Sequence, residues 1–362
     1  PPKSDYALVI LDGLGDRPHP ETGNQSPVEA AATPNLDGLA AQGQMGEVVV
    51  VGPGVAPESD AGVYALLGYN PVEDSPGRGV LEAEGLGLPM APDDVAFRMN
   101  FATIDGERRV LDSRVGRSLT TAESEELARS LTGARLLDDQ RIDVRVAASV
   151  GHRGVVLLHA RDPDRPLSPH LSNTDPFYER IGSLGAAARP VDPRILPVAG
   201  LEGTPEAQRT ADAVNLWVTR ALDHLAGHPV NARRALSGRK MANGLLLRNA
   251  GSPGAHRAVT FETKYGLRGG SLTEMPVERG IARRLGLTDR FVGPMGPDRE
   301  AGYSARARVA RELLEQTPFV YVHLKGPDEP GHDGRARQKQ EIIEAIDRFF
   351  FGPFLEGLDP AR

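Results

Sequence analysis

The stretch YALVILDGLGD, residues 6–16, decides the fold of this 362-residue chain. Its first six residues form an apolar, partly β-branched run, which predicts a buried parallel strand. The run stops at Asp12 and Gly13, where a tight turn is expected. Because α/β sheets carry function at the carboxyl ends of their strands, Asp12 is a candidate metal ligand. A turn or helix-capping role is the alternative explanation for the same carboxylate.

Outward from this strand, alternating apolar runs and helix-like segments predict an α/β fold. Thr33 and Pro34 predict a capped helix that Gly43 closes, and the run MGEVVVV at 45–51 predicts a second strand. Further strand-like or apolar runs lie at 95–104, 143–150, 154–159, 244–247, 258–261 and 319–324. Helix-like segments lie at 61–67, 122–131, 207–225, 277–285 and 305–316. The last runs predict βαβ units that return the chain to its first domain.

Length and composition limit the classes of protein to which the chain can belong. With 362 residues, 40% of them hydrophobic, it can bury a sizeable core and form about two domains. We expect a core domain of residues 1–93 and 232–362 and a second α/β domain of residues 94–231. The net charge of −7, with basic residues scattered along the chain, argues against a nucleic-acid partner.

The absence of cysteine excludes disulfides and thiolate chemistry, and leaves any metal to oxygen and imidazole ligands. The first residues lack the apolar region of a secretory signal, and no segment approaches the ~18 apolar residues of a membrane span. A cytoplasmic protein without a membrane partner is therefore expected. The oligomeric state is not encoded in any pattern that we recognise.

Ser59 is the second candidate, in a loop rich in glycine and proline before the apolar segment 61–67. Its hydroxyl is expected near a helix N-terminus, where backbone amides and the helix dipole favour a bound phosphate. A helix-capping serine is the simpler alternative. Serine is a poor nucleophile at neutral pH, and no histidine base lies nearby in the sequence, so metal coordination is the natural activator.

Asp328 and His332 form the third candidate, in the turn DEPGH that follows the predicted strand 319–324. A carboxylate and an imidazole with this spacing can converge on one divalent ion, and the mixed oxygen and nitrogen donors suit zinc or manganese. An exposed polar turn is the alternative explanation.

Seven ordered segments carry a resemblance to a known family over nearly the whole chain. They are LDGLGDRP, TPNLDGLA, SDAGVYALLGYNP, GRGVLEAEGLGL, FRMNFAT, KYGL and HLKGPDEPGHDG. Together they resemble the archaeal-type, cofactor-independent phosphoglycerate mutases of the alkaline phosphatase superfamily. The resemblance implies an alkaline-phosphatase-like core sheet flanked by helices, with an inserted smaller α/β domain that binds the substrate.

The resemblance also implies a metal-dependent mechanism in which the enzyme interconverts 3-phosphoglycerate and 2-phosphoglycerate, a step of glycolysis. Two divalent ions, manganese, zinc or magnesium, are expected. Asp12 and Ser59 would belong to one metal subsite, with Ser59 as the nucleophile that becomes phosphorylated. Asp328 and His332 would bind the other ion. Such a pair of ions would neutralise charge on the phosphoryl oxygens and lower the pKa of the serine hydroxyl.

In the second domain, the family-like segments at 151–154 and 172–176 are expected to line the substrate. Arg153 can hold a carboxylate or phosphate in a bidentate fork, while His152 or Asp175 can move the proton of the reacting hydroxyl. Further candidate substrate ligands are Asn173, Arg98, Arg114, Arg117 and, from the core domain, Lys264. A solvated surface role is the alternative for each basic residue.

Two departures from the family pattern leave alternatives open. The family continues past a helix like 340–350 into a strand whose end supplies an Asp-His pair and then a further histidine, whereas this sequence stops at Arg362. A truncated chain is the preferred explanation, and a non-catalytic binding homologue is one alternative. Asn173 and Phe177 stand where an Asp and a His are expected. The other alternative is therefore a transferase of a phosphonate or phosphinate pathway, which moves a phosphonate-type group onto a glycerate acceptor.

Overall fold

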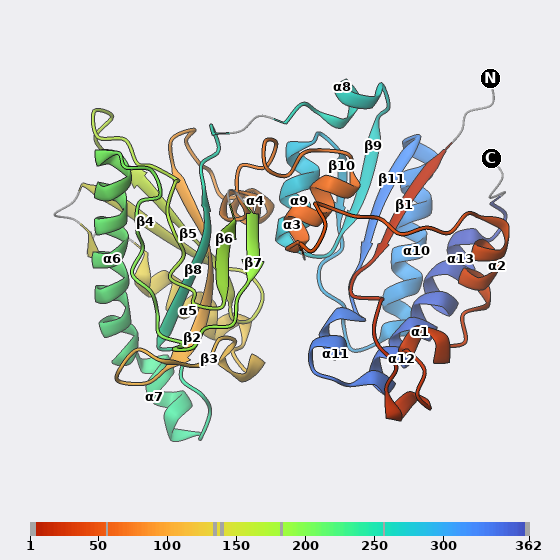
Figure 1. The fold of residues 1–362 in the computed structure, drawn as a ribbon, viewed down its shortest axis with the longest axis horizontal. Coiled ribbons are helices and arrows are strands. Elements are labelled where there is room, and N and C mark those ends of the chain that lie inside the picture. The colour runs from red at the N-terminus through yellow and green to blue at the C-terminus, as the bar shows by residue number, and fades with distance from the viewer. Residues whose placement is uncertain are drawn as a thin grey trace. The chain divides into compact units, whose positions relative to one another are not determined.

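Figure 1 shows the computed structural model, which describes residues 5–55, 57–132, 136–137, 141–181, 184–255 and 258–358. The chain forms two compact units. Unit 1 comprises Pro1–Val48 and Val259–Arg362, and unit 2 is the continuous stretch Val49–Ala258 between them. The expected domain boundaries near residues 93 and 231 both fall inside unit 2, so that division stays a prediction.

Unit 1 is built on a four-stranded parallel sheet in the order β1-β11-β9-β10. Its strands are β1 (Tyr6–Leu11), β9 (Gly269–Thr273), β10 (Thr288–Phe291) and β11 (Phe319–Leu324). Its helices are α1 (Pro27–Ala30), α2 (Pro34–Gln42), α8 (Phe261–Tyr265), α9 (Pro276–Arg284), α10 (Arg299–Gln316), α11 (Asp328–His332), α12 (Ala336–Ile346) and α13 (Gly352–Leu355). A 3-10 turn at Pro20–Thr22 and a π-helical turn at Asp347–Phe351 complete the unit.

The core of unit 1 lies between β11 and the helices that cover it. Val320 and Val322 of β11 pack in one apolar cluster with Tyr303 and Leu313 of α10 and with Phe350. Since all four strands run in the same direction, the residues that follow them meet at one edge of the sheet. This carboxyl edge positions Asp12 beside the residues that follow β9 and β11.

Unit 2 contains an antiparallel sheet in the order β3-β2-β5-β4, in which β8 also pairs with β2. Its strands are β2 (Val95–Ile104), β3 (Val110–Asp112), β4 (Ile142–Ala148), β5 (Arg153–Ala160) and β8 (Gly244–Gly251), and a separate pair consists of β6 (Tyr178–Ile181) and β7 (Leu184–Ala187). Its helices are α3 (Ser59–Leu66), α4 (Arg78–Leu86), α5 (Thr121–Leu131), α6 (Pro205–Ala226) and α7 (Pro229–Leu236), with a 3-10 turn at Val115–Arg117.

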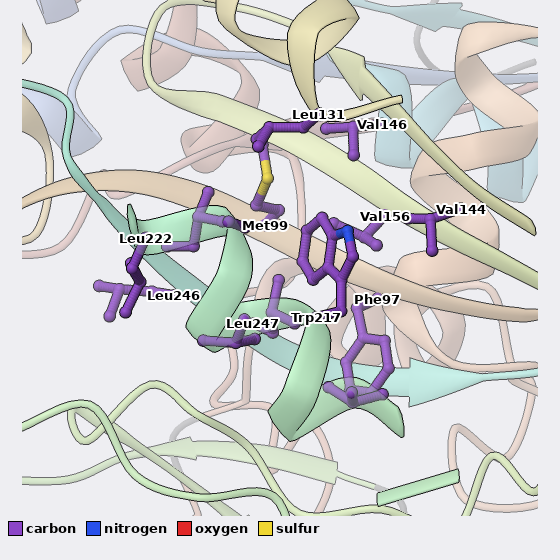
Figure 2. Close-up of a cluster of buried hydrophobic side chains, with 14 of the residues drawn as sticks. Phe97, Met99, Leu131, Val144, Val146, Val156, Trp217, Leu222, Leu246 and Leu247 are labelled. Carbon is purple, nitrogen blue, oxygen red and sulfur yellow. The ribbon is translucent and has the colours of Figure 1, made fainter. Parts of the chain in front are cut away.

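The core of unit 2 forms where α6 packs on this sheet. Figure 2 shows the indole of Trp217, from α6, among side chains of the central strands such as Phe97, Met99 and Val156. Trp217 is fully buried and is the single tryptophan of the chain. Burial of such large apolar side chains contributes about 1.5–3 kcal/mol each to folding, so this cluster holds the sheet rigid beneath the site.

Most of the predicted elements are confirmed. The strands predicted at 95–104 and 319–324 have the predicted bounds, and the helix predicted from Pro34 begins there. Thr33 is the N-cap residue of that helix, as predicted, but its side chain makes no capping hydrogen bond, because its hydroxyl bonds to the carboxylate of Asp37, 3.0 Å away. The mixed α/β class is confirmed, with a parallel sheet and flanking helices in unit 1.

Three predicted strands need correction. Residues 45–51 form no strand; Met45, Val48 and Val49 are 82%, 71% and 66% exposed, because β-branched composition does not provide a neighbouring strand to pair with. The run 244–247 is part of β8, which pairs antiparallel with β2 in unit 2 and so does not start a βαβ return to unit 1. The run 258–261 leads into α8. Within the described residues, no helix has the length and apolar content that crossing a bilayer requires.

Candidate active site

Asp12 lies at the carboxyl edge of the sheet in unit 1, where β1 ends. Its backbone amide donates to the carbonyl of Leu324, 3.0 Å away, which fixes it beside the end of β11. Its carboxylate forms an ion pair with the ammonium of Lys325, the residue that follows β11. The same ammonium lies 3.0 Å from Oε1 of Glu278, whose side chain is fully buried. Lys325 therefore bridges two carboxylates at the strand ends.

The ionisation of this group follows from its contacts. Burial raises the pKa of Asp12, but the hydrogen bond with His323 and the charge of Lys325 outweigh burial and hold that pKa well below its usual range. His323 lies with Nε2 3.5 Å from Asp12 Oδ2, and its Nδ1 lies 2.7 Å from the hydroxyl of Tyr321. Asp12 is thus held as a carboxylate inside a network of charged and polar groups.

Asp328 and His332 are the first and last residues of α11, which begins soon after β11. His332 Nε2 lies 3.4 Å from Asp328 Oδ1, and both side chains are about half exposed. Gly13 packs directly on this helix, since a Cβ atom at position 13 would lie 2.4 Å from the Cα of Asp328. The structure therefore brings the loop after Asp12 against the start of α11.

The fit of these residues to a metal ion is partial. Asp328 and His332 offer the oxygen and nitrogen donors that zinc and manganese accept. Asp12, however, is matched by the ammonium of Lys325. Among the residues that the structure describes, no three or more His, Asp or Glu side chains are grouped to hold a metal. The two-metal ligand set stays a prediction.

Lys264 lies at the other end of the sheet in unit 1. It belongs to α8, whose Phe261 stacks on Phe319, the first residue of β11, with ring centroids 4.5 Å apart. Figure 1 shows α8 and α11 at opposite ends of this sheet. The structure thus places Lys325, and not Lys264, next to Asp12. The predicted role of Lys264 as a phosphate ligand stays a prediction.

Ser59 is the first residue of α3 in unit 2. Glu58 is the N-cap residue and has an extended backbone, so the alternative of a capping serine is wrong. Ser59 is partly exposed, at a helix end whose first amides lack intrahelical partners. Since Asp12 belongs to unit 1, the predicted metal subsite shared by Asp12 and Ser59 stays a prediction.

Four predicted arginines lie close enough to His152, which is buried just before β5, for their charges to act on its imidazole. Burial, followed by the positive charges of these neighbours, lowers the pKa of His152 to about 3. The charges come from Arg153, Arg98, Arg114 and Arg117. The structure therefore brings five of the predicted site residues within electrostatic range of one another in unit 2, one of them a neutral imidazole. We call this set the arginine cluster.

The turn that carries two of these arginines has a strained backbone. Val115 and Arg117 have φ angles of 53° and 52°, a region that β-branched and long side chains rarely adopt. Val115 is fully buried and anchors the turn, and the carboxylate of Asp112 accepts a 2.8 Å hydrogen bond from the amide of Arg114. Strain that persists in this way is typical of functional sites.

His152 predicts how the stability of unit 2 depends on pH. In the unfolded chain its pKa is 6.5, so between that value and about 3 the unfolded state binds a proton that the folded state does not. Stability is fully present above the unfolded pKa and is lost as the pH falls. From about pH 7 to about pH 5 we expect a loss of about 2 kcal/mol through His152. Urea unfolding at each pH, followed by Trp217 fluorescence, measures this loss of stability.

The control is His152→Gln, in which this part of the slope is expected to disappear. His170→Gln, which alters a half-exposed histidine of the same unit, is expected to keep it. Equal slopes for the parent and His152→Gln would show that His152 titrates normally in the folded protein.

Asp175 and Asn173 lie beside the arginine cluster, in the buried loop before β6. Asp175 Oδ2 lies 3.7 Å from Nη1 of Arg248, and burial raises the pKa of Asp175 despite that positive charge. Arg248 in turn stacks on the ring of Tyr178, 3.4 Å from its centroid. Burial therefore makes Asp175 a better proton acceptor than an exposed carboxylate, which suits its predicted role.

The amide of Asn173 is engaged by the backbone at both ends. Its Nδ2 donates to the carbonyl of Tyr178 at 3.0 Å, and its Oδ1 accepts from the amide of Asn249 at 3.0 Å. An aspartate here could not donate to the Tyr178 carbonyl, which explains why an amide stands at this position. Phe177 packs against the apolar core of unit 2. These contacts account for both departures structurally, and substrate binding by Asn173 stays a prediction.

Sequence reasoning missed four charged or polar residues of the site: His323, Lys325, Glu278 and Arg248. His323 and Lys325 stand within the segment HLKGPDEPGHDG, and a cation at a strand end was the available signal. Glu278 and Arg248 gave no local signal, because their roles depend on pairing between elements that are distant in sequence.

A parallel sheet with flanking helices and charged side chains at its carboxyl edge places the chain among the α/β enzymes. The profile of the family described as 2,3-bisphosphoglycerate-independent phosphoglycerate mutase matches residues 40–231. A protein of that name from Aeropyrum pernix is 44% identical over 359 residues, which cover 98% of this chain and 83% of the relative. The chain belongs to this family of isomerases, and the resemblance seen in the sequence is confirmed.

Further comparisons agree. The Methanopyrus kandleri protein of the same name is 36% identical and covers 98% of this chain and 79% of the relative. A solved structure from Pyrococcus horikoshii has a TM-score of 0.72 at 29% identity, covering 99% of this chain and 79% of that one. The cofactor-independent phosphoglycerate mutase of Thermoplasma acidophilum has a TM-score of 0.56 at 31% identity, covering 98% of this chain and 84% of that one.

Proposed function

We propose that the chain interconverts 3-phosphoglycerate and 2-phosphoglycerate through a phosphoserine at Ser59. The observation that carries the proposal is the arginine cluster around His152, in the same unit as Ser59 and in a member of this mutase family. Phosphoglycerate carries a phosphate and a carboxylate, and guanidinium groups bind both in bidentate geometry. These arginines direct positive charge toward both groups, and Arg98 is also paired with Glu82 at 3.0 Å.

In this proposal the glycerate stays bound while the phosphoryl group moves between the substrate and Ser59. The phosphoryl group of 3-phosphoglycerate passes to the Ser59 oxygen, the glycerate reorients, and the 2-hydroxyl then takes the group back. His152, which is neutral, and Asp175, whose pKa burial raises, are the groups that accept and return the hydroxyl proton. Bound anion would also offset the arginine charges that hold the pKa of His152 low.

We also propose that divalent metal ions take part, with Asp328 and His332 holding one ion and Asp12 and Ser59 belonging to the subsite of another. When bound, such ions neutralise charge on the phosphoryl oxygens and lower the pKa of the serine hydroxyl. Within the family, unit 1 then corresponds to an alkaline-phosphatase-like core and unit 2 contains the substrate-binding domain. The support is the placement of Asp12 and Asp328 at one sheet edge.

The phosphonate-type transferase is a weaker candidate for a structural reason. It rested on Asn173 and Phe177 standing in place of ionisable residues. Asn173 is bound at both ends by backbone groups and Phe177 packs in the core, so neither departure requires a different substrate.

Direct conversion of 3-phosphoglycerate, followed by phosphorus NMR with manganese present, tests the proposal. We expect 2-phosphoglycerate to accumulate to its equilibrium share. Calorimetric titration with manganese separates the alternatives. Bound ions without conversion would make phosphoglycerate the wrong substrate. Neither ions nor conversion, in the full-length protein as well as in this chain, would indicate a binding homologue.

A further inference from the structure

Arg78, the first residue of α4, contacts the carboxylates on both sides of Ser59. Its Nη1 lies 3.6 Å from Glu58 Oε1 and 3.4 Å from Asp60 Oδ1. Its Nε donates to Glu82 at 2.9 Å. The guanidinium side chain is only 10% exposed. A single buried cation therefore connects the two chain neighbours of the proposed nucleophile.

Glu58 is also fixed from the opposite side. Arg248 Nη2 lies 3.4 Å from Glu58 Oε1, and the side-chain amide of Asn249 donates to Glu58 Oε2. Gly185 packs so closely that a Cβ atom there would lie 2.2 Å from Glu58 Oε2. The residue before Ser59 is thus held by two arginines, an asparagine and a backbone contact, which leaves the start of α3 little freedom.

The contacts of Arg78 extend to the arginine cluster through a shared carboxylate. Glu82 accepts from Arg78 Nε and also from Arg98 Nη1, the latter at 3.0 Å. Arg98 is one of the four arginines around His152. Alternating charges therefore run from the neighbours of Ser59 through Arg78 and Glu82 to the cluster proposed to bind the substrate anion. Arg78, Glu82 and Arg98 are buried, where such pairs interact strongly.

We propose that Arg78 is a positioning residue for Ser59, which fixes the start of α3 by pairing with Glu58 and Asp60, the chain neighbours of the serine. The catalytic consequence rests on the proposed function. Without Arg78, Asp60 loses this cation and Glu58 keeps only Arg248 of its two arginines, so the start of α3 gains negative charge. That charge would loosen the start of α3 and repel an incoming phosphoryl group.

A unique thiol gives a readout that does not depend on turnover. Because the chain has no cysteine, Ser59→Cys places the only thiol at the site. In this background, Arg78→Met is expected to raise the thiol pKa, so that iodoacetamide alkylation near neutral pH slows about tenfold. Arg78→Lys is expected to give a smaller shift, because one ammonium keeps a charge but cannot span three carboxylates.

Arg234→Met is the matched control for loss of a buried arginine. Arg234 is fully buried in unit 2 and pairs with Glu123 at 2.8 Å, and it contacts none of the carboxylates beside Ser59. The thiol pKa is expected to stay at the parent value. An unchanged pH profile of alkylation in Arg78→Met, or an equal shift in Arg234→Met, would overturn the proposal. If Arg78→Met does not fold, the proposal is instead overturned when the pH profile of alkylation in Arg78→Lys equals that of the parent.

Turnover provides the second test, in chains that keep Ser59. Arg78→Met is expected to lower kcat for 3-phosphoglycerate about 100-fold with KM changed less than about threefold, since the residue acts on the nucleophile and not on the bound ligand. Arg78→Lys is expected to recover part of kcat. If the parent has no mutase activity, the proposed function is refuted, and the thiol assay alone then tests the positioning role of Arg78. An active parent with unchanged kcat in Arg78→Met refutes the positioning role alone.

Discussion

Replacing Ser59 by alanine is expected to abolish mutase turnover, with a loss in kcat of about 10⁴-fold or more. The hydroxyl is the atom that takes the phosphoryl group, and the substitution removes it while the arginine cluster stays intact. Ser59 is partly exposed at the first position of α3, so the free energy of unfolding should change by only about 0.5 kcal/mol. Phosphorus NMR measures the conversion rate, and intact-protein mass spectrometry measures phosphorylation.

Ser130→Ala is the matched control for this prediction. Ser130 is another partly buried helical serine of unit 2, and its hydroxyl bonds to the carbonyl of Leu127. It should keep full turnover and the same phosphorylated species as the parent. If Ser59→Ala keeps more than about a tenth of the parent kcat, the phosphoryl group does not pass through Ser59.

The fold could be predicted where the signal is local. β2 is buried along all ten of its residues, and its mainly apolar sequence gives its bounds although it includes Arg98 and Asn100. The run at 45–51 is rich in valine but stays exposed, because a strand also needs a partner, which composition does not specify. β8 shows the same limit: its strand character is local, whereas its antiparallel pairing with β2 is not.

The candidate site likewise combines positions that the local sequence predicts with contacts between elements that are distant in sequence. The position of Ser59 at a helix start follows from the turn residues before it and the apolar residues after it. The proximity of these arginines to His152 depends on the pairing of β2 with β5 for Arg98, and on the strained turn after β3 for Arg114 and Arg117. Neither feature has a local sequence pattern. Lys325 could be seen as a strand-end cation, but its second carboxylate partner comes from α9.

Lys325→Met is expected to lower the free energy of unfolding by about 3–5 kcal/mol, because it leaves the buried carboxylate of Glu278 and the partly buried one of Asp12 without their shared cation. Lys325 pairs with Asp12 and lies 3.0 Å from Glu278, and only 23% of its side chain is exposed. Burial lowers the pKa of Lys325, but the charges of Glu278 and Asp12 outweigh burial and raise it, so the ammonium stays protonated at neutral pH. Urea unfolding followed by far-UV circular dichroism is the measurement, since Trp217 reports on unit 2.

Two further variants separate charge pairing from loss of a side chain. Adding Glu278→Gln to Lys325→Met removes one of the unpaired charges, and we expect it to restore part of the lost stability. Lys240→Met removes a lysine that lies 2.5 Å from Asp112 but is 54% exposed, and solvent screening limits that loss to about 1 kcal/mol or less. If Lys325→Met costs no more than Lys240→Met, the strand-end carboxylates do not depend on Lys325. The carboxyl edge of unit 1 would then tolerate its own negative charge without a cation.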